Sequence, residues 1–129
     1  MVGIVIVSHS RDIASGTAAL AAQMAGPEVR IEAAGGAPDG GLGTDGSLVG
    51  AAIAAADQGD GAIVLGDLGS AILTARHVLD EQVDGNGSIR LVDAPLVEGA
   101  IAAAVVSSAG RPLDEVAAAA EEARAIAKF

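Results

Sequence analysis

Gly3–Ser10, GIVIVSHS, is the most informative segment of this chain of 129 residues. Its first five residues are apolar without a break and rich in β-branched side chains, which is typical of a strand buried on both faces of a parallel sheet. In open α/β sheets, ligands and chemistry lie outside the carboxyl ends of the strands. The position of His9 directly after this strand therefore predicts a functional histidine, and the alternative is a polar turn residue without a role.

Helix and strand patterns alternate along the rest of the chain. Helices are predicted over Ile13–Ala25, Ser47–Asp57 and Ser70–Gln82, from Pro95 to about Ser108, and from Pro112 onward. Strands are predicted over Val29–Ala33, Gly61–Leu65 and Ser88–Val92. A loop is expected over Gly35–Gly46, which holds six glycines in twelve residues, and a turn over Asp84–Gly87.

This alternation predicts an α/β fold: a doubly wound, mainly parallel sheet with helices on both faces. The first and third strands are the most hydrophobic and are expected to form the inner pair, with the second strand at an edge. The resulting strand order is 2-1-3-4, and residues 1–129 are expected to form a single domain.

Composition limits the classes of function. The chain has no run of eighteen apolar residues and no basic leader, so we expect neither a membrane span nor a signal peptide, and a cytoplasmic location fits. It has no cysteine, which excludes disulfides and a thiol nucleophile. The only lysine, Lys128, is next to last, which argues against a phosphate-loop lysine and Schiff-base chemistry.

The charge balance limits the kinds of molecule that the protein can bind. Seven basic and seventeen acidic residues give a net charge of -10, which argues against binding to nucleic acid or to anionic membranes. A protein partner is instead expected to dock through a basic surface.

The predicted strand order also brings two polar segments together. A switch point lies between the first and third strands, where Ser8–Ser10 and Gly66–Ser70 face each other. His9 is therefore expected near Asp67. A carboxylate on one ring nitrogen fixes the tautomer of an imidazole and makes the other nitrogen a better base or nucleophile.

Residues that favour anion binding surround this pair. Gly69 and Ser70 open a helix, whose free N–H groups and positive dipole end attract anions, and glycines let backbone N–H groups approach closely. The expected anion-binding set is Ser10, Arg11, Gly35, Gly36, Gly43, Thr44, Gly69 and Ser70. Two alternatives stay open: the glycines only form turns in a glycine-rich chain, and Arg11 is a surface residue that interacts with Asp12.

The second histidine, His77, is interpreted as an ordinary surface residue. It lies seven residues after Ser70, about 10 Å along a helix axis. A metal site shared with His9 lacks a third ligand, so no metal is expected.

Several segments together resemble a known family. They are VSHS (residues 7–10), GG (35–36), GTD (43–45), GDLGSA (66–71) and DAPLVEGA (93–100). In this order they resemble the phosphotransfer subunit of phosphoenolpyruvate-dependent dihydroxyacetone kinase, which is similar to the mannose-family IIA domains of the sugar phosphotransferase system. The resemblance covers essentially the whole chain. The mannose-transporter relatives typically carry a longer glycine-rich segment after the third strand.

The resemblance implies a phosphohistidine relay without a cofactor. His9 would accept a phosphoryl group from the histidine phosphocarrier protein, with Asp67 orienting the ring. His9 would pass the group to ADP on the nucleotide-binding kinase subunit, and the resulting ATP would phosphorylate dihydroxyacetone on another subunit. Family members are commonly homodimers, with a contact expected around Leu91, Val92 and Leu96.

Other functions stay open at this point. The chain could be a mannose-type IIA component of a sugar transporter, or a regulatory binding module without phosphotransfer. A hydrolase of small phosphate esters is less favoured, because phosphohistidine phosphatases of the common type need a second histidine and several arginines, and only Arg11 lies nearby.

Overall fold

The computed structural model describes residues 1–81 and 88–129. Its strands are β1 (Gly3–Ser8), β2 (Ile31–Gly35), β3 (Ala62–Gly66) and β4 (Ile89–Leu91). Its helices are α1 (Arg11–Ala25), α2 (Gly46–Ala56), α3 (Gly69–Glu81), α4 (Leu96–Ser108) and α5 (Leu113–Glu122), followed by a 3-10 turn at Ala123–Ala125. The predicted turn at Asp84–Gly87 and the predicted helix end at Gln82 lie outside the described residues.

The four strands of the described chain form one parallel sheet in the order β2-β1-β3-β4, which confirms the predicted order and the α/β class. The second strand lies at an edge as predicted, but it runs two residues later than expected. Val29 instead packs into the core, and pairing with β1 begins at Ile31 opposite Ile4. Gly35, expected to open the loop, is the last strand residue.

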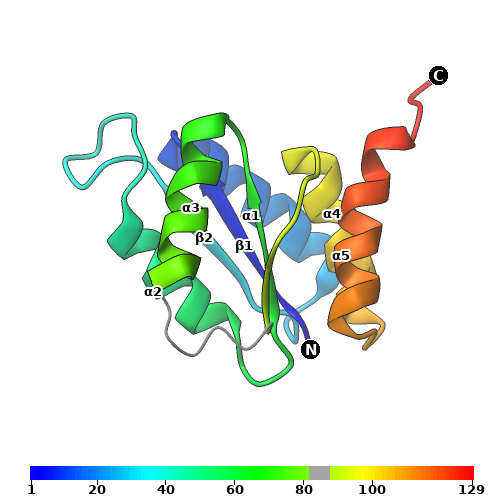
Figure 1. Ribbon diagram of the computed structural model, residues 1–129. Helices are drawn as coiled ribbons and strands as arrows, with labels where there is room; N and C mark the ends of the chain where they lie inside the picture. Colours follow the sequence, from blue (N-terminus) through cyan, green and yellow to red (C-terminus); the bar gives the residue numbers. More distant parts are fainter. Residues whose placement is uncertain (82–87) are drawn as a thin grey trace.

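Helices cover both faces of the sheet. In Figure 1, α2 and α3 lie in front of the sheet and α1 and α4 behind it, with α5 beside α4. The carboxyl ends of β1 and β3 point to the top of this view, where α3 begins and the loop between β2 and α2 projects. This arrangement confirms the doubly wound architecture and directs the polar segments after β1 and β3 to the same edge.

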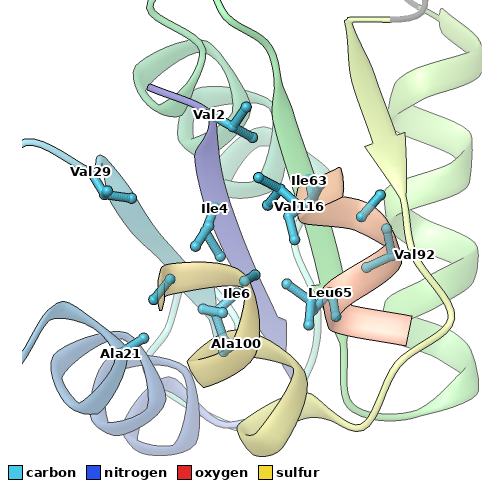
Figure 2. Close-up of a cluster of buried hydrophobic side chains, with 14 of the residues drawn as sticks. Val2, Ile4, Ile6, Ala21, Val29, Ile63, Leu65, Val92, Ala100 and Val116 are labelled. Atoms are coloured by element: carbon cyan, nitrogen blue, oxygen red, sulfur yellow. The ribbon is translucent and has the colours of Figure 1, made fainter. Parts of the chain in front are cut away.

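Two cores hold the layers together. Ile4, Ile6, Ile63 and Leu65 face α1, α4 and α5, as Figure 2 shows for one core. Alternate residues of the same strands, including Val5, face α2 and α3. Both inner strands are therefore buried on both faces, and full burial of each such side chain contributes about 1.5–3 kcal/mol.

The expected dimer contact includes a residue of this core. Val92 is only 2% exposed and packs among the side chains on the α4 and α5 side of the sheet, so it is not available as a surface contact. That part of the prediction is wrong. Leu91 and Leu96 are half-buried and pack against the two cores.

No helix in residues 1–81 and 88–129 combines the length and the apolar character needed to cross a bilayer.

Candidate active site

His9 and Asp67 meet at the carboxyl end of the sheet. β1 ends at Ser8 and β3 ends at Gly66, and the two strands are parallel neighbours, so the next residue of each emerges at the same edge. His9 Nδ1 lies 3.0 Å from Asp67 Oδ1, and the two side chains are 25% and 15% exposed. The structure thus brings together the two residues that the sequence pattern paired.

Asp67 accepts hydrogen bonds on both carboxylate oxygens. Oδ2 accepts from the Ser8 hydroxyl at 2.7 Å and from the His9 backbone N–H at 3.2 Å. Oδ1 accepts from the Leu68 backbone N–H at 2.7 Å and faces the His9 ring. An ionised carboxylate only accepts, so this arrangement selects the tautomer of His9 with its proton on Nδ1. The lone pair is then on Nε2.

The same hydrogen bonds act on the acidity of Asp67. Burial alone would raise the pKa of its carboxyl group, because the charged form loses hydration. Hydrogen bonds from the Ser8 hydroxyl, the His9 ring and the backbone N–H groups of His9 and Leu68 outweigh burial and hold the pKa below its ordinary value. Asp67 is therefore a carboxylate at neutral pH.

The other ring nitrogen of His9 faces the start of α3. Nε2 is in hydrogen-bond contact with the hydroxyl of Ser70. In the described structure, the backbone N–H groups of Gly69, Ser70 and Ala71 donate to no protein acceptor, as expected for the first turn of a helix. These donors and the helix dipole favour a negative charge next to Nε2.

The glycine-rich loop binds the backbone around His9, whereas the sequence predicted that its N–H groups bind an anion. The N–H of Gly43 donates to the His9 carbonyl at 2.9 Å, and that of Gly36 donates to the Ser8 carbonyl at 3.2 Å. These two N–H groups are engaged and not free for an anion. Gly35 has a packing role, since a Cβ there would lie 2.6 Å from the Ser10 carbonyl oxygen. These glycines let the loop and α1 close tightly around the histidine.

Thr44 follows this loop and carries a polar atom without a partner. Its Oγ1 is buried and makes no hydrogen bond within the described part of the chain. Leaving a buried hydroxyl unsatisfied costs about 1–3 kcal/mol. Thr44 comes directly after Gly43, whose N–H holds the His9 backbone. This unsatisfied hydroxyl fits the expected role in anion binding.

Ser10 and Arg11 begin α1. The Ser10 side chain caps the helix by accepting from the Ile13 N–H at 3.2 Å, so its hydroxyl has a structural function. Arg11 is exposed and makes no ion pair in the described structure. The other basic residues, Arg76 apart, pair with carboxylates; they are Arg30, Arg90, Arg111, Arg124 and Lys128. Arg11 is thus an unpaired cation two residues along the chain from His9.

His77 lies on the exposed surface of α3, as interpreted from the sequence. Its side chain is 74% exposed, and its Nε2 lies 3.1 Å from a carboxylate oxygen of Glu81 one turn later. Within the residues that the structure describes, no three His, Asp or Glu side chains gather closely enough to hold a metal ion.

Ser8 is the site residue that sequence reasoning missed. The sequence pattern assigns it only to the polar segment Ser8–Ser10. The available signal was the alternation along β1, in which Ile4, Ile6 and Ser8 share one face of the sheet. A serine in a buried row of isoleucines requires a hydrogen-bond partner, and Asp67 supplies it.

The chain thus presents a carboxylate-bound histidine at the switch point of a parallel α/β sheet. Residues 3–117 match the EIIA-man family, described as the PTS system fructose IIA component, and the chain belongs to that family. The expected resemblance to mannose-type IIA domains is confirmed.

Relatives within this family carry more particular names. The chain is 41% identical over 110 residues to "PEP-dependent dihydroxyacetone kinase 2, phosphoryl donor subunit DhaM" of Listeria innocua, covering 83% of this chain and 86% of the relative. It is 44% identical over 121 residues to the DhaM subunit of Pantoea ananatis, covering 90% of this chain. The match spans only 25% of that longer relative.

A solved structure agrees with the fold. A crystal structure of a protein of unknown function superposes with a TM-score of 0.81 at 36% sequence identity, covering 94% of each chain.

Proposed function

We propose that this protein is a phosphohistidine relay in which Nε2 of His9 carries the phosphoryl group. The observation that carries the proposal is the pairing of Nδ1 with Asp67 at 3.0 Å, which leaves the Nε2 lone pair facing the amino end of α3. A nucleophilic nitrogen and a cradle for a dianion are therefore adjacent.

The chemistry is a displacement at phosphorus in two steps. In the first, the Nε2 lone pair of His9 forms a P–N bond while the P–N bond of a phosphohistidine donor breaks and returns the electron pair to the donor ring. In the second, a phosphate oxygen of the acceptor forms the new P–O bond and His9 leaves as a neutral imidazole. While His9 is phosphorylated and keeps its Nδ1 proton, the ring is cationic, and the Asp67 carboxylate balances that charge.

The residues around Nε2 supply the binding groups for the phosphoryl oxygens. The Ser70 hydroxyl contacts Nε2, and the free N–H groups of the same helix start are further donors. In this proposal the unsatisfied Thr44 hydroxyl and the unpaired Arg11, which lie near His9 in the loop and at the start of α1, would add a donor and a positive charge once a phosphoryl group is bound.

The names of the relatives support a choice of partners. They are phosphoryl donor subunits of a PEP-dependent dihydroxyacetone kinase. We therefore propose the histidine phosphocarrier protein as the donor and ADP on the nucleotide-binding kinase subunit as the acceptor, with dihydroxyacetone bound on a further subunit. A homodimer and a cytoplasmic location stay predictions.

Intact-mass measurement tests this function. The purified protein is incubated with phosphoenolpyruvate, enzyme I and the phosphocarrier protein, with the carrier omitted in a matched sample. The proposal predicts a carrier-dependent mass gain of one phosphoryl group, which is lost on addition of the kinase subunits and ADP. A regulatory module would gain no mass. A label that persists with ADP and the kinase subunits, but is discharged by a sugar-specific transporter domain, would support the transporter alternative.

A further inference from the structure

We infer that Ser8 is a positioning residue whose hydroxyl holds Asp67 in the orientation that directs the His9 ring. The inference concerns the site of the proposed phosphotransfer and rests on that function for its kinetic part. Ser8 touches neither the imidazole nor an incoming phosphoryl group in this arrangement, so it acts through Asp67.

Strand pairing places Ser8 beside Asp67. Val7 is opposite Gly66 in the register of β1 and β3, so Ser8 and Asp67 are the next neighbouring positions. They continue the buried rows of Ile4 and Ile6 on β1 and of Ile63 and Leu65 on β3. Ser8 has no exposed surface, so water cannot substitute for the hydrogen bond that it makes.

The surroundings of Ser8 fix the direction of its single hydroxyl proton. The backbone N–H of Ser10 donates to Ser8 Oγ at 3.0 Å, which occupies the oxygen as an acceptor. Asp67 Oδ2 lies 2.7 Å from the same oxygen and can only accept. The hydroxyl proton must therefore point at Asp67, and this short bond to a charged acceptor is of the strong kind.

The hydrogen bond from Ser8 to Oδ2 of Asp67 determines the orientation of Oδ1, the other carboxylate oxygen. With Oδ2 bound by Ser8, Oδ1 is turned toward His9 Nδ1. Without the hydroxyl, Oδ2 keeps only the His9 backbone N–H at 3.2 Å, a longer contact. The carboxylate would then be held less firmly, and its selection of the Nδ1–H tautomer would weaken. Because two backbone donors remain, the expected effect is a partial loss and not an abolition.

The test compares three variants with the wild type. Ser8→Ala removes the hydroxyl, and Ser8→Thr keeps it on a β-branched side chain that suits a strand. Ser107→Ala is the matched control, since Ser107 is equally buried and its hydroxyl donates to the Val2 carbonyl at 2.5 Å, at the other end of β1. Ring nitrogen chemical shifts of His9 are recorded on unphosphorylated, 15N-labelled protein, at a pH where the ring is neutral.

The shifts read the tautomer without any phosphotransfer. We expect Nδ1–H in the wild type, in Ser8→Thr and in Ser107→Ala, and a mixture with Nε2–H in Ser8→Ala. Transfer from the phosphocarrier protein should slow about tenfold in Ser8→Ala only. An unchanged tautomer in a folded Ser8→Ala protein would overturn the inference, as would an equal change in Ser107→Ala. A tautomer change in a protein that never accepts a phosphoryl group would support the positioning role and contradict the proposed function.

Discussion

Two aspartates flank β3 and differ in what they hold. Asp57 precedes the strand at the amino end of the sheet and accepts from the backbone N–H groups of Gly59 and Gly61, both at 3.0 Å. Asp67 follows the strand at the carboxyl end and accepts hydrogen bonds from the ring of His9, the hydroxyl of Ser8 and two backbone N–H groups. The same type of side chain thus closes a turn at one end of β3 and orients the histidine at the other.

The hydrogen-bond donors of these two carboxylates, more than their burial, distinguish a structural aspartate from one in the active site. The backbone donors of Asp57 lie within four residues of it and shape its own loop, and its side-chain donor is the Ser88 hydroxyl, at a long 3.5 Å and just before β4 at the same end of the sheet. The side-chain donors of Asp67 come from about sixty residues away, across the switch point. The carboxyl end of a parallel sheet is also where chemistry is expected.

The largest expected effect is at the nucleophile. His9→Ala should abolish carrier-dependent phosphorylation, because Nε2 is the proposed attacking atom. His77→Ala is the control and should be labelled like the wild type, since its imidazole is exposed and paired with Glu81. Intact mass after incubation with the carrier measures both. An acid-labile, base-stable label persisting in His9→Ala would contradict the assignment.

The second largest effect is expected at Asp67, and the matched substitution at Asp57 is its control. Losing the charge-assisted bond to the imidazole should cost about 1.5–3 kcal/mol, so Asp67→Asn should slow transfer by roughly one to two decades. Asp57→Asn should lower the melting temperature and leave the rate constant within about twofold of wild type, because its contacts are structural. Rapid-quench kinetics and thermal melts measure the two effects. Equal transfer rates in both variants would show that the comparison is wrong.

The third effect concerns docking. Leu68 and Leu42 lie next to the site and are 62% and 80% exposed, which suits a small, partly apolar surface for a transient complex. Leu68→Asp should weaken the apparent affinity for the kinase subunit about tenfold without loss of folding, and saturation with the subunit should restore much of the rate. Val105→Asp, at a half-exposed position of α4, is the control.

A titration of the kinase subunit at two salt concentrations measures this effect. With a net charge of -10, encounters with a basic partner face should be steered electrostatically and weaken with ionic strength. An unchanged affinity in Leu68→Asp, or a wild-type rate that does not respond to salt, would contradict the docking proposal.

The smallest effect is on stability in acid. The folded-state pKa of Asp67 lies below its ordinary value of 3.8, so the carboxylate contributes stability above that pH. This contribution is lost as the pH falls through the lowered folded-state pKa. Urea unfolding of wild type and Asp67→Asn should therefore show a difference at neutral pH that shrinks in acid. A difference that is constant with pH would mean that Asp67 is not stabilised as an anion.

The comparison also shows how far the sequence could predict the molecule. The apolar runs of β1 and β3 determine the inner strands, and the strand order then brings Asp67 to His9. The roles of Gly36 and Gly43 could not be predicted, because any glycine offers an N–H and only the fold shows which carbonyl it meets. Ser8 was missed because its function depends on the register between β1 and β3.

The site of phosphorylation is tested most sharply by the one-bond coupling between 15N and 31P in phosphorylated, 15N-labelled protein. The phosphoryl group is proposed on Nε2 of His9, because Nδ1 is held by Asp67 at 3.0 Å. This proposal predicts that the phosphorus couples to Nε2 and that Nδ1 keeps its proton. Coupling to Nδ1 of His9, or to any other residue, would contradict it.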